Sequence, residues 1–404
     1  MKKIAVIGSG AGGLITSSKL AKDLYKEIKN GEVSITIFDK RTDQEFQPGY
    51  LEVAFRGTDP SKIRRPIDKL ISPGVQVVHK NIEKVDLAER YVKTEGDGGE
   101  KVDFDYIVIS TGASPDNDQI DGLKEANMDF HTSANKSSLI YNQVSKIKSG
   151  RIVVGIGGVP YKCPPSPNES AFMLDEYFRK AGIRDKVEIT YVTPFTRIYS
   201  AETINEVIAP MYENRNIESI TVFNTDTVDS KKKEITSIEG ETLKYDYLYL
   251  TPPHKTAGFL KESEIVDEDG WVKVDKKDMH ITTYDNGFAI GDTTNIPISK
   301  AGVEAHLEGI VVANNITGDI NGTGKAYNFT GRTQCSMETG FHKATFVVGT
   351  YDRPVEKIQP STMNYMEKKV MEKIYWSSLH GHYEWLFKHH FKEDYFEHQE
   401  PIAH

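Results

Sequence analysis

Short apolar runs and a longer amphipathic stretch alternate along the first forty residues. The runs at 3–7 and 33–38 have the length and composition of strands buried in a parallel sheet. Between them, residues 14–29 carry leucine and isoleucine at helical spacing, as an amphipathic helix does. The pattern therefore predicts a strand, a helix and a second strand in succession.

The same kind of run recurs further along the chain. Apolar runs at 105–109, 151–154, 187–192 and 288–290 each predict another buried strand, and residues 303–315 predict a helix. Strands that alternate with helices are typical of a parallel sheet covered by helices. We therefore expect an α/β fold with two Rossmann-like dinucleotide-binding domains and a C-terminal amphipathic helical tail.

The expected domains are interleaved in the sequence. Residues 1–115 and 280–330 should form the first dinucleotide-binding domain, which is therefore discontinuous. Residues 116–279 should form the second, including the loop with the first of the two cysteines. Residues 331–404 should hold the second cysteine and the helical tail.

A glycine-rich loop separates the first strand from the first helix. Gly8, Gly10 and Gly13 fit the pattern G-x-G-x-x-G, whose glycines let backbone amides approach a pyrophosphate at the helix N-terminus. An acid at the end of the second strand can bond the hydroxyls of an adenosine ribose. The predicted nucleotide-binding residues here are Gly8, Gly10, Ala11, Gly12, Gly13, Asp39 and Lys40.

Composition narrows the classes of function. The chain has 404 residues, 38% of them hydrophobic, and a formal net charge of −9, which argues against nucleic acid as the main partner. Two cysteines cannot form a disulfide framework, so a cytosolic protein is the default expectation. The N-terminal apolar run is too short for a signal peptide, and no apolar stretch has the roughly 20 residues of a membrane helix. Any membrane contact should therefore be peripheral.

Cys163 stands between a glycine-rich stretch and Pro164. A residue before proline is pushed toward extended backbone, so we expect it in a loop. Ser166 and Glu169 have the spacing of a capping box, with Pro167 at the first helical position. The thiol should then lie near a helix N-terminus, which favours the thiolate. The alternative is a buried structural cysteine.

A second glycine loop, at 155–160, follows the strand predicted at 151–154. Its third glycine position is Pro160, so a helix cannot start on the turn and present amides to a pyrophosphate. The strand at 187–192 ends in Thr193 and Pro194, with no acid for a ribose. We expect a loop that has lost its nucleotide and has gained the cysteine segment; a degenerate loop without a replacement function is the alternative.

Two further predicted strands each end in a turn of small residues. One continues into Thr111-Gly112 and the other into Gly291-Asp292. With the first glycine loop, these segments resemble the FAD-binding elements of flavoproteins with two dinucleotide-binding domains, over roughly residues 1–345. That group includes disulfide reductases, type II NADH dehydrogenases, flavocytochrome c sulfide dehydrogenases and sulfide:quinone oxidoreductases. The resemblance implies FAD and adds Thr111, Gly112, Gly291 and Asp292 to the cofactor-binding residues.

The segments around the two cysteines resemble only some of these families. Tyr161-Lys162-Cys163-Pro164-Pro165 and Cys335-Ser336-Met337-Glu338-Thr339-Gly340 are similar to segments of sulfide:quinone oxidoreductases and flavocytochrome c sulfide dehydrogenases. The resemblance implies that Cys163 and Cys335 are the catalytic pair, and that Lys300 places a cation near the flavin. As a hypothesis, sulfide attacks a Cys163–Cys335 disulfide, and Cys335 then passes two electrons through FAD to a quinone.

Many relatives carry a third cysteine that this chain lacks. Residues 125–133 contain only Met128 and His131 as notable side chains. A thioether link to FAD at that position is therefore impossible, and we expect non-covalent FAD there. The general base stays unassigned: capping explains Glu169, while His131, His254 and His306 are candidates that are more often structural. No metal ligand set is predicted.

The composition changes from residue 362 onward. Aromatic side chains alternate with lysine and histidine on either side of Gly381, which predicts two short amphipathic helices. Rings beside cations suit a membrane interface, so we expect a peripheral membrane protein, on the cytoplasmic face, with sulfide and a membrane quinone as partners. The alternative is a helix pair that covers the core or joins two copies of the chain in a homo-oligomer.

Four other functions stay open. A type II NADH:quinone oxidoreductase or an NAD(P)H-dependent disulfide or persulfide reductase would need an intact second glycine loop. A flavocytochrome c-type sulfide dehydrogenase would need export and a haem partner. A non-catalytic flavin-binding scaffold would need neither cysteine.

Overall fold

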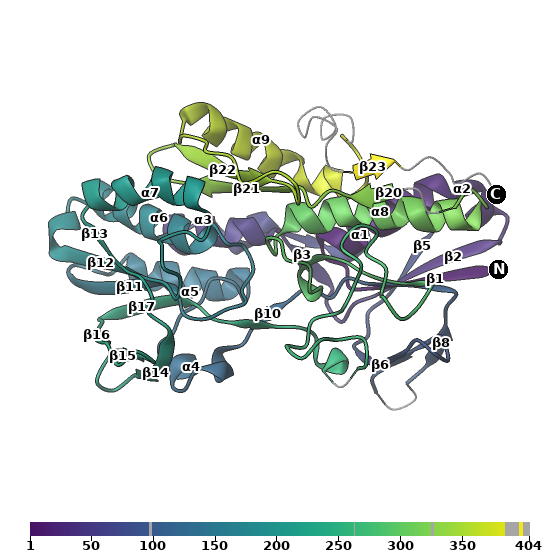
Figure 1. The fold of residues 1–404 in the computed structure, drawn as a ribbon, viewed down its shortest axis with the longest axis horizontal. Coiled ribbons are helices and arrows are strands. Elements are labelled where there is room, and N and C mark those ends of the chain that lie inside the picture. Colours follow the sequence, from purple (N-terminus) through teal and green to yellow (C-terminus); the bar gives the residue numbers. More distant parts are fainter. Residues whose placement is uncertain (97–98, 262, 325–326, 384–395, 399–404) are drawn as a thin grey trace.

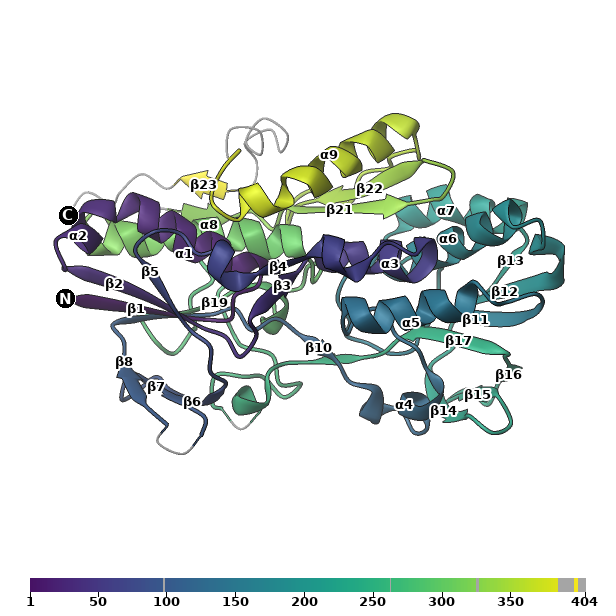
Figure 2. The same ribbon diagram turned by 180° about the vertical axis from the view of Figure 1, so that it is seen from behind.

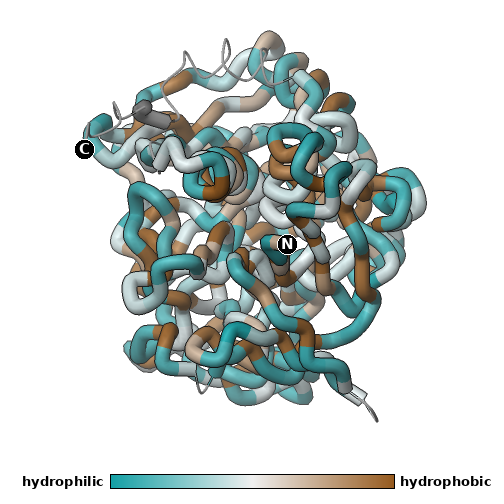
Figure 3. The backbone as a smooth tube through the Cα atoms, turned by 90° about the vertical axis from the view of Figure 1, so that its right-hand side faces the viewer, coloured by the Kyte–Doolittle hydropathy of each residue, from teal (hydrophilic) through white to brown (hydrophobic). Residues whose placement is uncertain are grey.

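The computed structural model describes residues 1–96, 99–261, 263–324, 327–383 and 396–398. Figure 1 shows two α/β units side by side along the long axis, and Figure 2 shows the same arrangement from behind. In the end-on view of Figure 3, hydrophobic stretches run through the middle of the molecule and most peripheral loops are hydrophilic.

The first unit is built on a parallel sheet of strand order β19-β9-β1-β2-β5. Residues far apart in sequence meet here, because β19 pairs with β9 in parallel. The helices α1 and α8 lie side by side over this sheet (Figure 1). The bounds are β1 Lys2–Ile7, α1 Ala11–Asp23, α2 Tyr25–Lys29, β2 Val33–Phe38, β5 Val75–Val78, β9 Tyr106–Ile109, β19 Gly287–Ala289 and α8 Gly302–Ile320.

The second unit has a parallel sheet of order β13-β12-β11-β17. Its bounds are α5 Ala134–Val144, β11 Gly150–Ile156, α6 Ser166–Lys180, β12 Val187–Val192, α7 Glu202–Asn214, β13 Ile217–Ile220 and β17 Tyr247–Thr251. The antiparallel pair β10 (Ser114–Pro115) and β18 (His254–Lys255) links the two units. The predicted α/β fold with two parallel-sheet units is therefore confirmed.

Smaller elements surround the two sheets. They are β3 Asp43–Glu45, α3 Tyr50–Arg56, β4 Arg64–Pro66, β6 Ile82–Asp86, β7 Tyr91–Thr94, β8 Lys101–Asp103, α4 Leu123–Ala126, β14 Thr225–Asp229, β15 Glu234–Ser237, β16 Thr242–Lys244, β20 Tyr327–Phe329 and β23 Phe396–His398. The hairpin of β21 (Thr333–Glu338) and β22 (Ala344–Gly349) and the helix α9 (Thr362–Ser378) lie across one side of the molecule (Figures 1 and 2).

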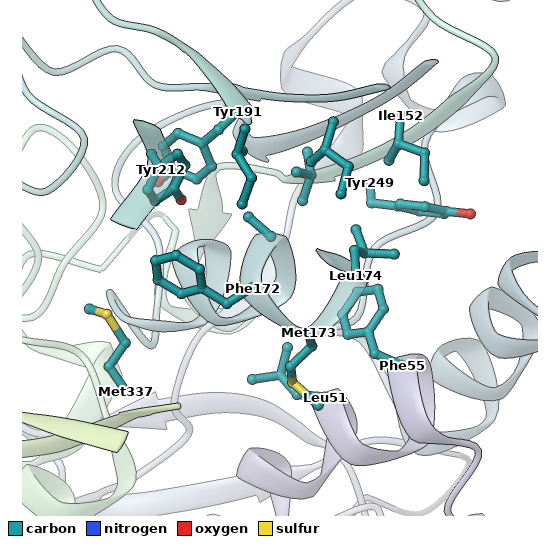
Figure 4. Close-up of a cluster of buried hydrophobic side chains, with 14 of the residues drawn as sticks. Leu51, Phe55, Ile152, Phe172, Met173, Leu174, Tyr191, Tyr212, Tyr249 and Met337 are labelled. Atoms are coloured by element: carbon teal, nitrogen blue, oxygen red, sulfur yellow. The ribbon is translucent and has the colours of Figure 1, made fainter. Parts of the chain in front are cut away.

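One core holds the hairpin, α6 and α3 together. Figure 4 shows Leu51 and Phe55 of α3, Phe172 and Leu174 of α6, and Met337 of β21 in this cluster of buried side chains. Cys335 belongs to the same core. The two cysteines lie in the loop before α6 and on the strand β21. Both segments are therefore attached to one hydrophobic core, which is rigid because it is close-packed.

Most predicted elements match, with shifted ends. The strand at 187–192 has the predicted bounds, while the helix expected at 14–29 is divided into α1 and α2. The domain boundaries 1–115 with 280–330, 116–279 and 331–404 stay a prediction. The helix α3 crosses the predicted boundary in space. Its Leu51 and Phe55 belong to the range 1–115 but pack in the core of the second unit.

The tail differs in part from the prediction. Its first expected helix is α9, whose Ile374, Tyr375 and Trp376 pack against the core of the first unit. Its second expected helix falls on residues that lie mostly outside the described part, and 396–398 form the short strand β23 instead of a helix end. The core-covering alternative therefore holds for one face of α9.

Candidate active site

The first glycine loop leaves room for a phosphate at one position and is packed shut at two others. A Cβ on Gly13 would lie 1.9 Å from the carbonyl oxygen of Gly8, and one on Gly8 would lie 2.4 Å from that of Ser110. A Cβ on Gly10, the N-cap of α1, would meet nothing within 4 Å, and none of the described side chains caps this helix. The amides of Ala11 and Gly12 lie at the N-terminus of α1, and the space beside Gly10 is open. This arrangement fits the pyrophosphate of a dinucleotide.

Asp39 lies at the end of β2, as predicted, and Arg41 holds it. The carboxylate of Asp39 accepts hydrogen bonds from the Ser9 amide at 2.8 Å and from the Arg41 guanidinium at 2.7 Å. Burial alone would raise the pKa of Asp39, but Arg41 and Ser9 lower it to about 2. A ribose hydroxyl would have to replace one of these donors. Lys40 is exposed, and the sequence reasoning overlooked Arg41.

The two turns expected at the cofactor meet at the ends of β9 and β19. The hydroxyl of Thr111 donates to that of Thr293 at 3.2 Å. Gly112 has a φ of +64°, and a Cβ there would meet nothing within 4 Å, which leaves a second open position. The Gly291 amide donates to the buried carboxyl of Glu308 at 2.5 Å, and burial raises the pKa of Glu308 to about 8.

Lys300 is anchored beside Asp292. Its ammonium donates to the carbonyl oxygens of Asp292 at 3.0 Å and Thr294 at 2.6 Å, and lies 3.9 Å from the ring centroid of Trp271. Burial lowers the pKa of Lys300, and the carboxylate of Asp292 opposes that effect. Lys300 and Asp292 also line a small cavity. The prediction of a fixed cation at this turn agrees with these contacts.

Cys163 lies in a loop, as expected, but its backbone is not extended. Its φ is +58°, in the left-handed region that non-glycine residues rarely adopt. Tertiary hydrogen bonds select this conformation: the Cys163 amide donates to the Lys300 carbonyl at 2.7 Å, and the Ser166 amide donates to the Cys163 carbonyl at 3.0 Å. The expectation of extended backbone was wrong because these bonds outweigh the steric preference before proline.

The predicted capping box does not form. The helix α6 begins at Ser166, and its N-cap Pro165 offers no side-chain cap. The Ser166 hydroxyl turns back to donate to the Cys163 carbonyl at 2.8 Å. Glu169 accepts a hydrogen bond from the Glu338 amide at 2.8 Å, so it ties α6 to β21. Burial raises the pKa of Glu169 to about 7, which makes it a group that exchanges a proton near neutral pH.

The Cys163 thiol is not activated in this state. Burial first, and then the carboxylate of Glu169, raise its pKa to about 12, although hydrogen bonds from Ser166 lower it. The expectation that the helix N-terminus favours the thiolate was therefore wrong. Desolvation of a charge outweighs a helix terminus, whose effect is about 1 kcal/mol.

Cys335 is buried on β21 against the first turn of α8. Its sulfur lies 3.6 Å from an oxygen of Glu304, which also accepts a hydrogen bond from Thr333. Burial raises the pKa of Cys335 well above its usual value, and the charges of Glu304 and Cys163 add to this. Burial also raises the pKa of Glu304 to about 7.

The two cysteines belong to one electrostatic cluster, as free thiols. Each would raise the pKa of the buried Tyr199 if it were charged, and Cys163 would raise that of Cys335. The hydrogen bond from the Cys163 amide to Lys300 joins this cluster to the turn after β19. The structure thus brings Cys163, Cys335, Lys300 and Asp292 into one region.

Lys162 and two of the candidate bases, His131 and His254, are buried near the cysteine loop. The ammonium of Lys162 donates to the carbonyl of Ala113 at 3.3 Å. His131 bonds the Ser166 hydroxyl at 2.9 Å, and His254 bonds the Pro252 carbonyl at 2.9 Å. The third candidate base, His306, is buried, which lowers its pKa to about 4.

The second glycine loop is packed tightly at two of its glycines, and no helix begins on it. A Cβ on Gly155 would lie 2.1 Å from the Val192 carbonyl, and one on Gly158 would lie 2.8 Å from the ring of Pro253. β11 ends at Ile156 and α6 begins only at Ser166, so no helix starts on the turn. Lys162 and Cys163 occupy the intervening segment. This geometry agrees with the expectation of a loop without a pyrophosphate cradle.

Comparison with known proteins identifies the family. The sequence profile of the family described as pyridine nucleotide-disulphide oxidoreductase matches residues 2–314. The chain belongs to this family. The predicted resemblance to flavoproteins with two dinucleotide-binding domains is thereby confirmed.

Individual relatives extend over most of the chain. A mitochondrial sulfide:quinone oxidoreductase of Dictyostelium discoideum is 26% identical over 396 residues, which cover 93% of this chain and 85% of the relative. A type II NADH:quinone oxidoreductase of Staphylococcus aureus (strain MSSA476) is 24% identical, with 88% of this chain and 91% of that protein covered. The solved structure of the sulfide:quinone oxidoreductase from Aquifex aeolicus has a TM-score of 0.86 at 20% identity and covers both chains fully. This last likeness confirms the fold.

Among the helices of the described ranges, none combines the length and the apolar character needed to cross a bilayer.

Proposed function

We propose that this chain is a sulfide:quinone oxidoreductase that uses FAD. It oxidises hydrogen sulfide at Cys163 and Cys335 and passes two electrons to a membrane quinone. The observation that carries the proposal is that the two cysteines, distant in sequence, belong to one electrostatic cluster, which a backbone hydrogen bond from Cys163 ties to Lys300. The similarity to sulfide:quinone oxidoreductases over 93% of the chain supports it.

The residues of the first unit fit FAD. Gly10 and the free amides of α1 would receive its pyrophosphate, and Asp39 its ribose. Residues 125–133 contain no cysteine, so FAD would have no thioether link at that position. When bound, FAD accepts two electrons from the thiol pair and releases them to the quinone.

The protein's own residues supply the sulfur and proton chemistry. In the oxidised enzyme, Cys163 and Cys335 would form a disulfide; attack by sulfide breaks it and leaves a persulfide and a thiolate. A cysteine thiolate is costly here, because burial raises both thiol pKa values. Glu304, 3.6 Å from the Cys335 sulfur, and Glu169, whose charge acts on Cys163, have pKa values of about 7 and can exchange protons at neutral pH. Lys300 would offset negative charge at the turn after β19.

The exposed face of α9 supports a membrane contact. Met363, Met366 and Val370 are spaced at i, i+3 and i+7 and are 79%, 58% and 48% exposed, while the opposite face packs on the core. We infer that this stripe inserts into the headgroup region and brings the protein to the quinone pool, on the cytoplasmic face.

The second candidate function is type II NADH:quinone oxidation, favoured by the likeness to the Staphylococcus aureus enzyme. It would require a helix N-terminus on the glycine turn after β11 to receive a pyrophosphate, and α6 begins only at Ser166.

Single substitutions of the cysteines test the proposal. Cys163→Ser and Cys335→Ser should each retain bound FAD and lose at least about 100-fold of the sulfide:quinone turnover, as expected when the nucleophile or its partner is removed. Serine keeps the volume, so the flavin spectrum controls for folding. Turnover within a few-fold of the wild type in both variants would overturn the proposal.

A further inference from the structure

The carboxyl of Glu304 is in direct contact with one of the two cysteine sulfurs. Its oxygens lie 3.6 Å and 3.9 Å from the sulfur of Cys335 on β21. Thr333, on the same strand, donates a hydrogen bond to the same carboxyl. Glu304 is 1% exposed and Cys335 is 7% exposed, so bulk water is kept away from this contact. A proton can therefore pass between the sulfur and the carboxyl without an intermediate group.

The two cysteines differ in their access to a small nucleophile. Cys163 lies in the loop before α6 and is half-buried, whereas Cys335 lies on a strand inside the core. Sulfide should therefore attack the sulfur of Cys163, which makes Cys335 the leaving sulfur. A thiolate left at Cys335 would be unfavourable, because burial disfavours its charge. The leaving sulfur needs a proton donor beside it.

The groups that face Glu304 keep a proton on it up to neutral pH. Burial raises the pKa of Glu304 to about 7, and the charge of Asp292, on the turn after β19, acts in the same sense. A charge on Glu304 in turn raises the pKa of Glu308, one turn further along α8, and of Tyr199. Lys300 lines the same small cavity as Glu304, and its ammonium donates to two backbone carbonyls.

The position of Glu304 also suits the carboxylate that remains after the proton has left. Glu304 lies in the first turn of α8, where the helix dipole favours an anion. The Thr333 hydroxyl and the backbone amide of Glu304 itself donate hydrogen bonds to it. Both protonation states therefore have partners, as expected of a group that gives up a proton and takes it back.

We propose that Glu304 is the general acid that protonates Cys335 as sulfide opens the disulfide. This deepens the proposed function and rests on it. Hydrosulfide forms a bond to the sulfur of Cys163, and the Cys163–Cys335 bond breaks with its electron pair going to Cys335. The proton of Glu304 passes to that sulfur. The products are a persulfide on Cys163, a thiol on Cys335 and the carboxylate of Glu304, which takes the proton back when Cys335 gives up its electrons.

The pH dependence of disulfide opening tests this role. Anaerobic rapid mixing of the FAD-loaded protein with sulfide measures flavin bleaching from pH 6 to pH 9, at sulfide concentrations to which the rate is proportional. The rate is expressed per hydrosulfide ion, so that the ionisation of sulfide itself does not enter. For the wild type, this rate should fall by about tenfold or more as pH rises, because the carboxylate of Glu304 has no proton to donate.

Two substitutions separate proton donation from a structural role. Glu304→Gln keeps the size of the side chain, should be about tenfold slower than the wild type at pH 6 and should show no fall with pH. The amide also lacks the charge that raises the pKa of Cys335, so this variant should equal or exceed the wild type at pH 9. Glu304→Asp keeps an acid and should keep the fall with pH. The exposed Glu125→Gln is the control and should follow the wild type.

The outcomes distinguish the two proposals. If sulfide bleaches the wild type at no pH, the proposed function fails. If sulfide bleaches the wild type but the profiles of the wild type and Glu304→Gln are parallel, the inference alone fails, because a constant difference is what a structural role would give.

A measurement on the wild type does not depend on the folding of a variant. Proton transfer from Glu304 should make bleaching slower in deuterium oxide at pH 6 and should leave it unchanged at pH 9. An equal rate in both solvents at pH 6, or a rate per hydrosulfide ion that does not change with pH, would overturn the inference.

Discussion

The sulfur of Cys335 lies 3.6 Å from a carboxylate oxygen of Glu304, in the first turn of α8. β21 and α8 thereby place a thiol and a carboxyl in contact inside a core, where charge on either group disfavours charge on the other. This contact and the hydrogen bond from Cys163 to Lys300 connect the sulfur chemistry to the first unit.

Glu304→Gln should make Cys335 more reactive. The carboxylate of Glu304 raises the pKa of Cys335, so the neutral amide should lower the pKa of this thiol. Alkylation of reduced protein, followed by mass spectrometry from pH 6 to pH 9, measures the shift. Glu308→Gln, which removes a neighbouring buried carboxyl that bonds Gly291, is the control and should leave Cys335 unchanged. Equal alkylation curves for Glu304→Gln and the wild type would refute the contact.

Glu169 should make stability fall as pH rises. Its folded pKa of about 7 exceeds the ordinary 4.5, so the native state binds the proton more tightly between these values. Stability from this group is present below pH 4.5 and is lost as pH rises to 7. Relative to Glu169→Gln, the free energy of unfolding of the wild type should drop by about 2 kcal/mol between pH 5 and pH 7.5.

Urea unfolding at a series of pH values measures this difference. The exposed Glu125→Gln serves as the control and should follow the wild type. Parallel curves for the wild type and Glu169→Gln would show that Glu169 keeps an ordinary pKa.

Alanine should have different effects at two glycines of the first glycine loop. At Gly13 the new Cβ meets the Gly8 carbonyl at 1.9 Å, so Gly13→Ala should lower the free energy of unfolding of the apoprotein by about 3 kcal/mol or more. At Gly10 the Cβ meets no described protein atom within 4 Å, so the apoprotein should be as stable as the wild type. Its FAD affinity should still fall about tenfold or more, because the Cβ enters the pyrophosphate space. Normal FAD binding by Gly10→Ala would place the cofactor elsewhere.

The exposed stripe of α9 should govern binding to lipid. Replacing Met363, Met366 and Val370 together by Gln removes apolar area that would leave water at about 25 cal/mol per Å², and should reduce liposome binding about tenfold or more. Ile238→Gln is the control: this residue is 73% exposed and follows β15, on the opposite side of the molecule from α9 (Figure 1). Equal loss in both variants, or none in the triple variant, would argue against α9 as the contact.

Patterns of neighbouring residues were enough to predict the two sheets and the first glycine loop. Strands such as 187–192 and the turn at Gly8–Gly13 are specified by residues adjacent in sequence, because a buried strand needs an apolar run and a tight turn needs glycine. The family resemblance singled out Cys163, Cys335 and Lys300, and the structure gathers them in one region.

These patterns could not predict contacts between segments that are distant in sequence. Glu169 had the spacing of a cap, yet it bonds the amide of Glu338. The reactivity of Cys163 was predicted from a helix terminus, while burial decides its pKa. Desolvation in the folded chain raises the pKa of Glu304 and lowers that of Lys162, and the nearest neighbours in sequence give no guide to this burial.

The central claim is that sulfide, and not a nicotinamide cofactor, reduces this enzyme through the cysteine pair. Anaerobic titration of the FAD-loaded wild type, monitored at the flavin absorbance band, tests it directly with sulfide in one arm and NADH in the other. The account predicts full bleaching by sulfide, no bleaching by NADH, and recovery of the colour when quinone is added. Bleaching by NADH with no response to sulfide would contradict it.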